Sequence, residues 1–98
     1  MKQEAVQIGQ VVQSTQGRDQ GRYMIVLDLL DDEYVLLVDG NLRRLDKPKK
    51  KKRKHFIATG LVSEEIRQRV KAAKKMNNAL IRVELERLLH NEPGKNGG

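Results

Sequence analysis

The sequence predicts a mainly β domain followed by one or two C-terminal helices. Residues 6–45 consist of short runs rich in apolar and β-branched side chains, as in strands, and turn signals such as glycines and acids separate these runs. Residues 63–90 instead repeat apolar side chains at the spacing of one helix face. The chain has 98 residues and no cysteine, so we expect one small domain without disulfides.

The first two strands are expected at 6–13 and 23–30. The alternation over 6–13 skips at Gly9–Gln10, which predicts a bulge. The polar segment 14–21 carries two glycines and is expected to form a loop. Residues 23–30 are rich in apolar, β-branched and aromatic side chains, and they form the clearest strand of the sequence.

The next strand is expected at 34–38, after an acidic turn at 31–33. Asp39–Gly40 is a strong hairpin turn signal and predicts a short return strand at 42–45. Residues 55–60 can add a fifth short strand. Short strands joined by tight turns favour a small barrel over an open sheet, because closure hides the strand edges.

A helix is expected to begin after Ser63, a good N-cap, with Glu64 and Glu65 complementing the positive helix end. Asn77–Asn78 would end or kink this helix, and a leucine-rich helical pattern then continues until Pro93 stops it. The chain thus divides into three predicted regions: a barrel at 6–58 with a basic segment at 43–54, a helical region at 62–91, and a disordered tail at 92–98.

One segment carries the net positive charge of the chain. Residues 43–54 hold nine cations and one acid, a charge of +8, whereas the whole chain is +7 and the other 86 residues sum to −1. Such a concentration of charge indicates a site for a polyanion, and RNA is the leading candidate. The expected phosphate contacts are Arg43, Arg44, Lys47, Lys49, Lys50, Lys51, Lys52, Arg53 and Lys54, followed by His55.

The same basic segment has other interpretations. Residues 48–54 match the pattern of a nuclear import signal. Binding to anionic lipid ranks lower, because no apolar anchor flanks the run. Duplex DNA is a further candidate partner, and a solvated loop without any partner is the simplest alternative.

The glycine-bearing loop is the second candidate contact to RNA. Gly17 and Gly21 would let the loop backbone approach a partner closely, and Arg18 and Arg22 add cations whose planar forks suit phosphate. Alternatively, both glycines only satisfy the dihedral angles of turns.

Three segments in this half follow a recognisable order: Gly9–Val12, Gly17–Gly21 and Met24–Val26. In this order they resemble the KOW motif, which joins a strand, a glycine-bearing loop and a second strand within an SH3-like barrel. Residues 25–40 are more similar still to the fourteen-e family of large-subunit ribosomal proteins. The resemblance implies an SH3-like barrel of KOW type that binds ribosomal RNA as a cytoplasmic ribosomal or ribosome-associated protein. The lysine run 49–54 and the leucine-rich second helix depart from the family pattern, which leaves a permanent subunit and an accessory factor both open.

Other function classes find little support in the sequence. No Ser/His/acid arrangement or paired carboxylates indicate an enzyme, no calcium loop or other metal site is expected, and no cofactor is implied. No apolar run is long enough to span a membrane. With three aromatic residues, shape recognition of folded RNA is favoured over base stacking. We expect at least two of these three to lie in the core: Tyr23, Tyr34 and Phe56.

The leucine-rich second helix supports a different class of function. A protein-interaction module could bind a partner or a second copy of the chain through this helix or the barrel, with the basic run as an address tag. Alternatively, the same side chains pack on the barrel or within a helical hairpin. The first helix is expected to have a basic outer face that extends the RNA-binding surface. The apolar side chains in question are Leu80, Val83, Leu85, Leu88 and Leu89.

Overall fold

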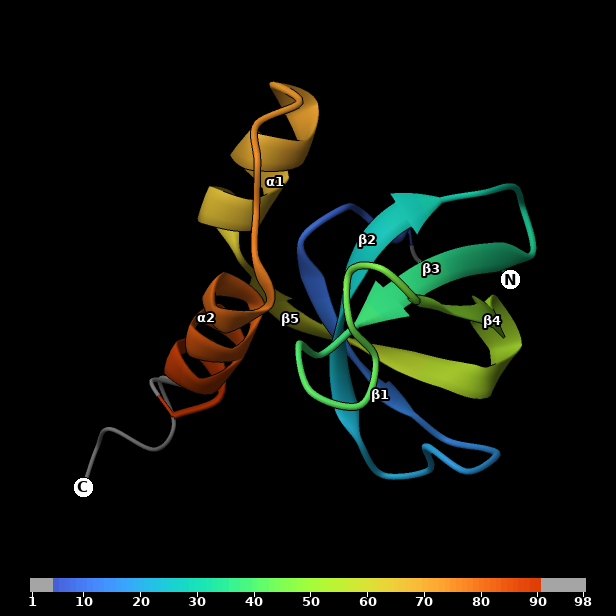
Figure 1. The fold of residues 1–98 in the computed structure, drawn as a ribbon. Helices are drawn as coiled ribbons and strands as arrows, with labels where there is room; N and C mark the ends of the chain where they lie inside the picture. The colour runs from blue at the N-terminus through green and yellow to red at the C-terminus, as the bar shows by residue number, and fades with distance from the viewer. Residues whose placement is uncertain (1–4, 91–98) are drawn as a thin grey trace.

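Five antiparallel strands and two helices make up residues 5–90, the part of the chain that the computed structural model describes (Figure 1). The expected mainly β fold with C-terminal helices is confirmed, whereas the predicted tail at 92–98 lies outside the described residues. The elements are β1 (Gln10–Ser14), β2 (Tyr23–Leu29), β3 (Tyr34–Val38), β4 (Lys49–Lys52), the single 3-10 turn η1 (Arg53–His55), β5 (Phe56–Val62), α1 (Glu64–Lys71) and α2 (Asn78–His90).

The strands form one sheet in the order β4-β3-β2-β1-β5. The first four strands follow one another as a meander, and β5 returns to pair with β1. Figure 1 shows the sheet curling into a barrel-like shape, with both helices on the side away from β4. Two strands agree closely with the prediction, because β2 and β3 occupy the clearest apolar runs of the sequence.

The first strand is shorter than predicted. Strand β1 begins at Gln10 because Gly9 turns the chain, with a φ of +90°. A Cβ at Gly9 would lie 2.7 Å from the carbonyl oxygen of Ser63, so only glycine fits between the sheet and α1. The predicted bulge lies close by, since the pairing of β1 with β5 shifts register between Gln10 and Val12.

The return strand predicted at 42–45 is wrong, and the lysine run forms β4 instead. The Asp39 carboxylate accepts hydrogen bonds from the amides of Asn41 and Arg43 (2.9 and 2.8 Å), which holds this segment as a loop. The amide of Leu45 donates to Oδ1 of Asn78 (2.8 Å), so the loop docks on the start of α2.

Four consecutive lysines can form β4 because the strand pairs with β3 through its backbone, whatever its side chains are. The register sets Lys52 opposite Tyr34 and Lys51 opposite Val35. Strand β4 is at the edge of the sheet, so most of its side chains can remain in water. Charged side chains on such an edge also discourage pairing with other chains.

Two apolar clusters lie on opposite faces of the sheet. The consecutive pairs Val11–Val12 and Leu37–Val38 send one side chain to each face, which explains their unbroken apolar runs. The inner cluster, enclosed by the curled sheet, contains Val12, Met24, Val26, Val35, Leu37 and Phe56. The outer cluster lies between the sheet and the helices and contains Val11, Ile25, Val38, Ile66 and Ile81.

The helical region consists of two helices, one of the two expected arrangements, but the first helix ends before Asn77–Asn78. Helix α1 ends at Lys71, and Ala73 follows with a φ of +55°, a conformation that a helix cannot contain. A new helix begins only at Asn78, where the Oδ1 atom of Asn77 accepts a hydrogen bond from the amide of Leu80 (2.8 Å). Within residues 5–90, no helix has the length and apolar character needed to cross a membrane.

Ser63 joins the sheet, α1 and α2 in one buried hydrogen-bond network. Its amide donates to the Gly9 carbonyl (2.8 Å), and its hydroxyl accepts from the amide of Ile66 (3.1 Å), as predicted for an N-cap. The same hydroxyl donates to Oε1 of Glu84 (2.7 Å), which Arg87 also contacts (2.8 Å). The hydrogen bond from Arg87 lowers the pKa of Glu84 despite the opposing effect of burial, and the hydrogen bond from Ser63 adds to this lowering.

Glu84→Gln should lower the free energy of unfolding at pH 7 by about 1–3 kcal/mol, because the buried Ser63 hydroxyl loses its charged hydrogen-bond acceptor. A carboxylate with a lowered pKa stabilises the fold above the ordinary value of 4.5, and this contribution disappears as the pH falls through the folded-state pKa. The free energy of unfolding, measured with urea between pH 7 and pH 3, should therefore depend less on pH in the variant than in the wild-type protein. Glu86→Gln, an exposed position of the same helix, is the control, and equal behaviour of the two variants would contradict the assignment.

Candidate nucleic-acid interface

The two candidate RNA contacts, far apart in the sequence, meet in one hollow. Gln16, Gly17 and Arg18 of the β1–β2 loop face the lysines of β4 across an open hollow of about 360 Å³. Tyr34 and His55 complete its lining. We refer to this feature as the basic hollow, and its lining residues are Gln16, Gly17, Arg18, Tyr34, Lys49, Lys50, Lys51, Lys52 and His55.

Lys51 holds the two walls of the basic hollow together. Its side chain turns inward, is 6% exposed, and donates from Nζ to Oγ of Ser14 (2.9 Å) and to the carbonyl oxygen of Gln16 (2.8 Å). Burial lowers the pKa of the Lys51 ammonium, while the negative charge of Asp19 acts in the opposite direction. Lys51 was predicted to contact phosphate, but the structure assigns its ammonium to these internal hydrogen bonds.

Asp19 supplies a buried negative charge beneath the cations of the loop. It is 2% exposed and accepts hydrogen bonds from Nε and Nη2 of Arg43 (3.3 and 3.0 Å). Burial alone would raise the pKa of Asp19, but the hydrogen bond and charge of Arg43, with the charges of Lys51 and Lys49, hold it below its ordinary value. The guanidinium of Arg43 is therefore occupied by a fork-to-carboxylate pair inside the protein.

Both glycines of the loop adopt backbone conformations that other residues rarely adopt. Gly17 has a φ of +83° and Gly21 a φ of +89°, so the turn explanation holds for each. A Cβ at Gly17 would lie 3.6 Å from the Lys51 ammonium, whereas a Cβ at Gly21 would meet no atom within 4 Å. Close approach of a partner to this backbone stays a prediction. Next to Gly21, Arg22 is exposed and lies 3.8 Å from the buried carboxylate of Asp39.

Tyr34 lies in the basic hollow and not in the core. The Nζ atoms of Lys50 and Lys52 lie 4.6 and 5.8 Å from the centre of its ring, within the range of cation–π contacts. Tyr23 is 37% exposed and likewise lies outside the core. Phe56 is therefore the only aromatic residue of the core, and the expectation of at least two was wrong. As the first residue of β3, Tyr34 points away from the inner face to which the next residue, Val35, contributes.

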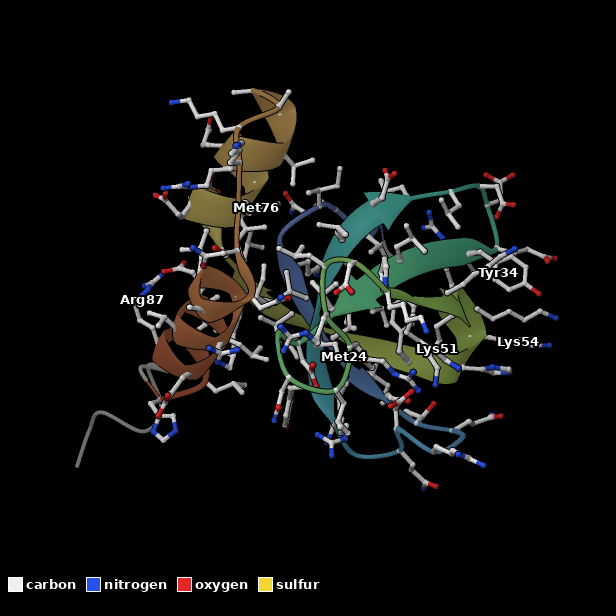
Figure 2. All side chains as sticks on the ribbon, viewed as in Figure 1. Met24, Tyr34, Lys51, Lys54, Met76 and Arg87 are labelled. Atoms are coloured by element: carbon white, nitrogen blue, oxygen red, sulfur yellow. The ribbon has the colours of Figure 1, made fainter. Side chains whose placement is uncertain are left out.

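The remaining predicted contacts lie at or beyond the rim. Lys54 is exposed near Tyr34 and extends away from the sheet (Figure 2). The guanidinium of Arg53 donates to the carbonyl oxygen of Asp31 (3.1 Å), and its Nε is buried without a partner among the described residues. Arg44 and Lys47 are exposed on the β3–β4 loop and do not line the basic hollow.

The basic face expected on the first helix is not continuous with the basic hollow. Arg67 and Arg69 pair with glutamates of their own helix, at 3.1 Å from Glu64 and 2.6 Å from Glu65. Figure 1 places α1 on the opposite side of the sheet from β4. The cations that reach solvent around the hollow are therefore Arg18, Lys54 and the β4 lysines other than Lys51.

Sequence reasoning missed the residues that organise the hollow, namely Ser14, Gln16, Asp19 and Tyr34. Only Asp19 left a signal, as an acid between two arginines in an otherwise cationic loop. Among residues 5–90, no three His, Asp or Glu side chains gather as ligands for a metal ion. No known protein family matches the chain, and no curated protein matches it either.

Lys51→Met should lower the free energy of unfolding by about 1–3 kcal/mol, because the buried Ser14 hydroxyl and the Gln16 carbonyl lose a charged donor. Lys50→Met removes the same charge one residue away from an exposed position, and it should change stability by about 0.5 kcal/mol or less. Urea unfolding followed by circular dichroism measures both variants. Equal stabilities of the two would show that the internal hydrogen bonds of Lys51 contribute nothing.

Proposed function

We propose that this protein binds structured RNA through the basic hollow, and that the RNA is ribosomal RNA of the large subunit. The observation that carries the proposal is that the glycine-bearing loop and the lysine strand, separated by about thirty residues in the chain, form two walls of one hollow. A solvated loop without a partner would not need to be held against a second cationic segment. The internal bonds of Lys51 and the Asp19–Arg43 pair hold these walls in place.

The arrangement of the strands supports the SH3-like barrel of KOW type that the sequence resembles. Strand β5 returns to pair with β1, the sheet curls around an apolar core, and the 3-10 turn η1 separates β4 from β5. The strand–loop–strand segment of the KOW resemblance corresponds to β1, the loop with Gly17 and Gly21, and β2. In this proposal the chain belongs to the cytoplasmic ribosome, either as a subunit or as an accessory protein.

The electrostatics of the hollow determine how the RNA is held. Lys51 and Arg43 are turned inward, so about five at least partly exposed cations remain at the hollow and its rim: Arg18, Lys49, Lys50, Lys52 and Lys54. Five phosphate contacts give a slope of log affinity against log salt of roughly −3.5 to −4.5. Such contacts position the RNA but carry no sequence information, so selectivity comes from the shape of the loop and the hollow.

The alternative of a protein-interaction module receives less support. Four of the five apolar residues that suggested a partner surface pack against the outer cluster beneath the helices, namely Leu80, Leu85, Leu88 and Leu89. Val83 is the exception at 60% exposed, and it lines an open groove of about 580 Å³ between the helices. The leucine content of α2 is thus explained by packing on the sheet.

Replacing Lys49, Lys50 and Lys52 together with glutamine should weaken binding to folded ribosomal RNA at least tenfold and reduce the salt slope by about 2–3. Lys51 stays in place, so the barrel is preserved. Fluorescence anisotropy titrations at several salt concentrations measure both quantities.

The matched control replaces Lys71, Lys74 and Lys75 with glutamine. Both variants have a net charge of +4, that is 7 − 3, but the control positions follow or end α1, on the far side of the sheet (Figure 1). Affinity should fall much less in the control. An equal loss in the two variants would mean that total charge, and not the basic hollow, determines binding.

The ribosomal part of the proposal needs its own test. The protein should sediment with large ribosomal subunits in a gradient, remain bound through a wash in moderate salt, and be released by ribonuclease. Equal affinity for duplex DNA and folded ribosomal RNA at one salt concentration would instead favour a general nucleic-acid binder.

A further inference from the structure

The basic hollow contains a half-buried aromatic ring, Tyr34, that lies among cations. Phe56 is buried in the inner cluster, and Tyr23 does not line this hollow. Tyr34 stands at the start of β3, beside Lys50 and Lys52 of the paired strand. His55 adds a second planar ring to the lining. A flat apolar surface beside ammonium groups matches the two parts of a nucleotide, its base and its phosphate.

The lysine over the ring can be displaced by a base. An exposed cation–π contact is worth about two- to fivefold in an equilibrium, whereas stacking of a nucleic-acid base on an aromatic side chain is worth roughly 5- to 150-fold. Exchange of the Lys50 ammonium for a base is therefore favourable. Lys50 is exposed and has a long side chain, so its ammonium can then turn to the phosphate of the same nucleotide.

The size of the hollow limits what enters it. Its volume of about 360 Å³ is at the lower end of the range for small-ligand sites, which suits one nucleotide. Bases within a duplex are stacked on both faces and offer no surface to Tyr34. A bulged or looped-out base offers a free face while the flanking phosphates stay near Arg18 and Lys52.

We infer that the basic hollow binds one unpaired nucleotide of a folded RNA, with its base stacked on Tyr34 and its phosphate held by Lys50, Lys52 and Arg18. This inference rests on the proposed RNA-binding function and adds the feature that is recognised. The expectation of shape recognition without stacking, drawn from the small number of aromatic residues, is thereby revised at one position.

Two RNA hairpins that differ by a single bulged uridine provide the test. The wild-type protein should bind the bulged hairpin about tenfold more tightly than the fully paired one at the same salt concentration. Tyr34→Leu should remove this preference by weakening only the bulged hairpin, and Tyr34→Phe should keep it within about threefold. Tyr23→Leu, at the exposed tyrosine outside the hollow, should leave both affinities unchanged.

A second measurement uses the wild-type chain and does not depend on the folding of any variant. With 5-iodouridine at the bulge, ultraviolet irradiation should join the RNA to the peptide that contains Tyr34, as identified by mass spectrometry. A crosslink to a different peptide would overturn the inference.

The outcomes separate the inference from the function on which it rests. Equal affinities of the wild-type protein for the two hairpins, or equal losses of affinity for both in Tyr34→Leu, would overturn the inference of a bound unpaired nucleotide. The proposed RNA binding would remain. Absence of salt-dependent binding to either hairpin and to ribosomal RNA would overturn RNA binding itself.

Discussion

The buried ammonium of Lys51 is the interaction on which the curl of the sheet and the basic hollow both depend. Strands β4 and β1 are not neighbours in the sheet, yet Lys51 of β4 donates to Ser14 of β1 and to Gln16 just beyond it. These bonds hold strand β4 over the inner cluster, and the negative charge of Asp19 compensates part of the charge of the Lys51 ammonium. The same bonds place the glycine-bearing loop against β4. The curl of the sheet and the shape of the hollow therefore depend on the same hydrogen bonds.

The formal charge of the basic segment is larger than the charge that it presents at the surface. The basic segment is the most charged part of the chain, but Lys51 turns inward and Arg43 is neutralised by the buried Asp19. What remains is a smaller group of cations around one ring, held by a rigid strand on one side and a constrained loop on the other. Because the backbone that carries these groups is already ordered before a partner arrives, less backbone entropy is lost on binding than with a flexible lysine-rich tail.

The sequence predicted what local patterns determine. Strands β2 and β3 follow from their apolar runs, and Ser63 caps its helix as its neighbours suggested. Strand β4 could not be predicted, because a lysine run has no apolar alternation and its strand conformation comes from pairing with β3. The loop at 42–45 was likewise misjudged, since its shape depends on Asn78, more than thirty residues away. The location of Tyr34 in the hollow could not be predicted for the same reason, because its neighbours in space come from a strand that the sequence did not reveal.

The charged edge of the sheet has a consequence for how the protein behaves at high concentration. Lysines along β4 keep other chains from adding a strand to this edge, but at physiological ionic strength their repulsion extends only about 8 Å. The protection therefore acts at short range and weakens wherever the ammonium groups are neutralised. The lysines that protect this edge are also those that would hold RNA in the proposed function, so a substitution among them should change both properties.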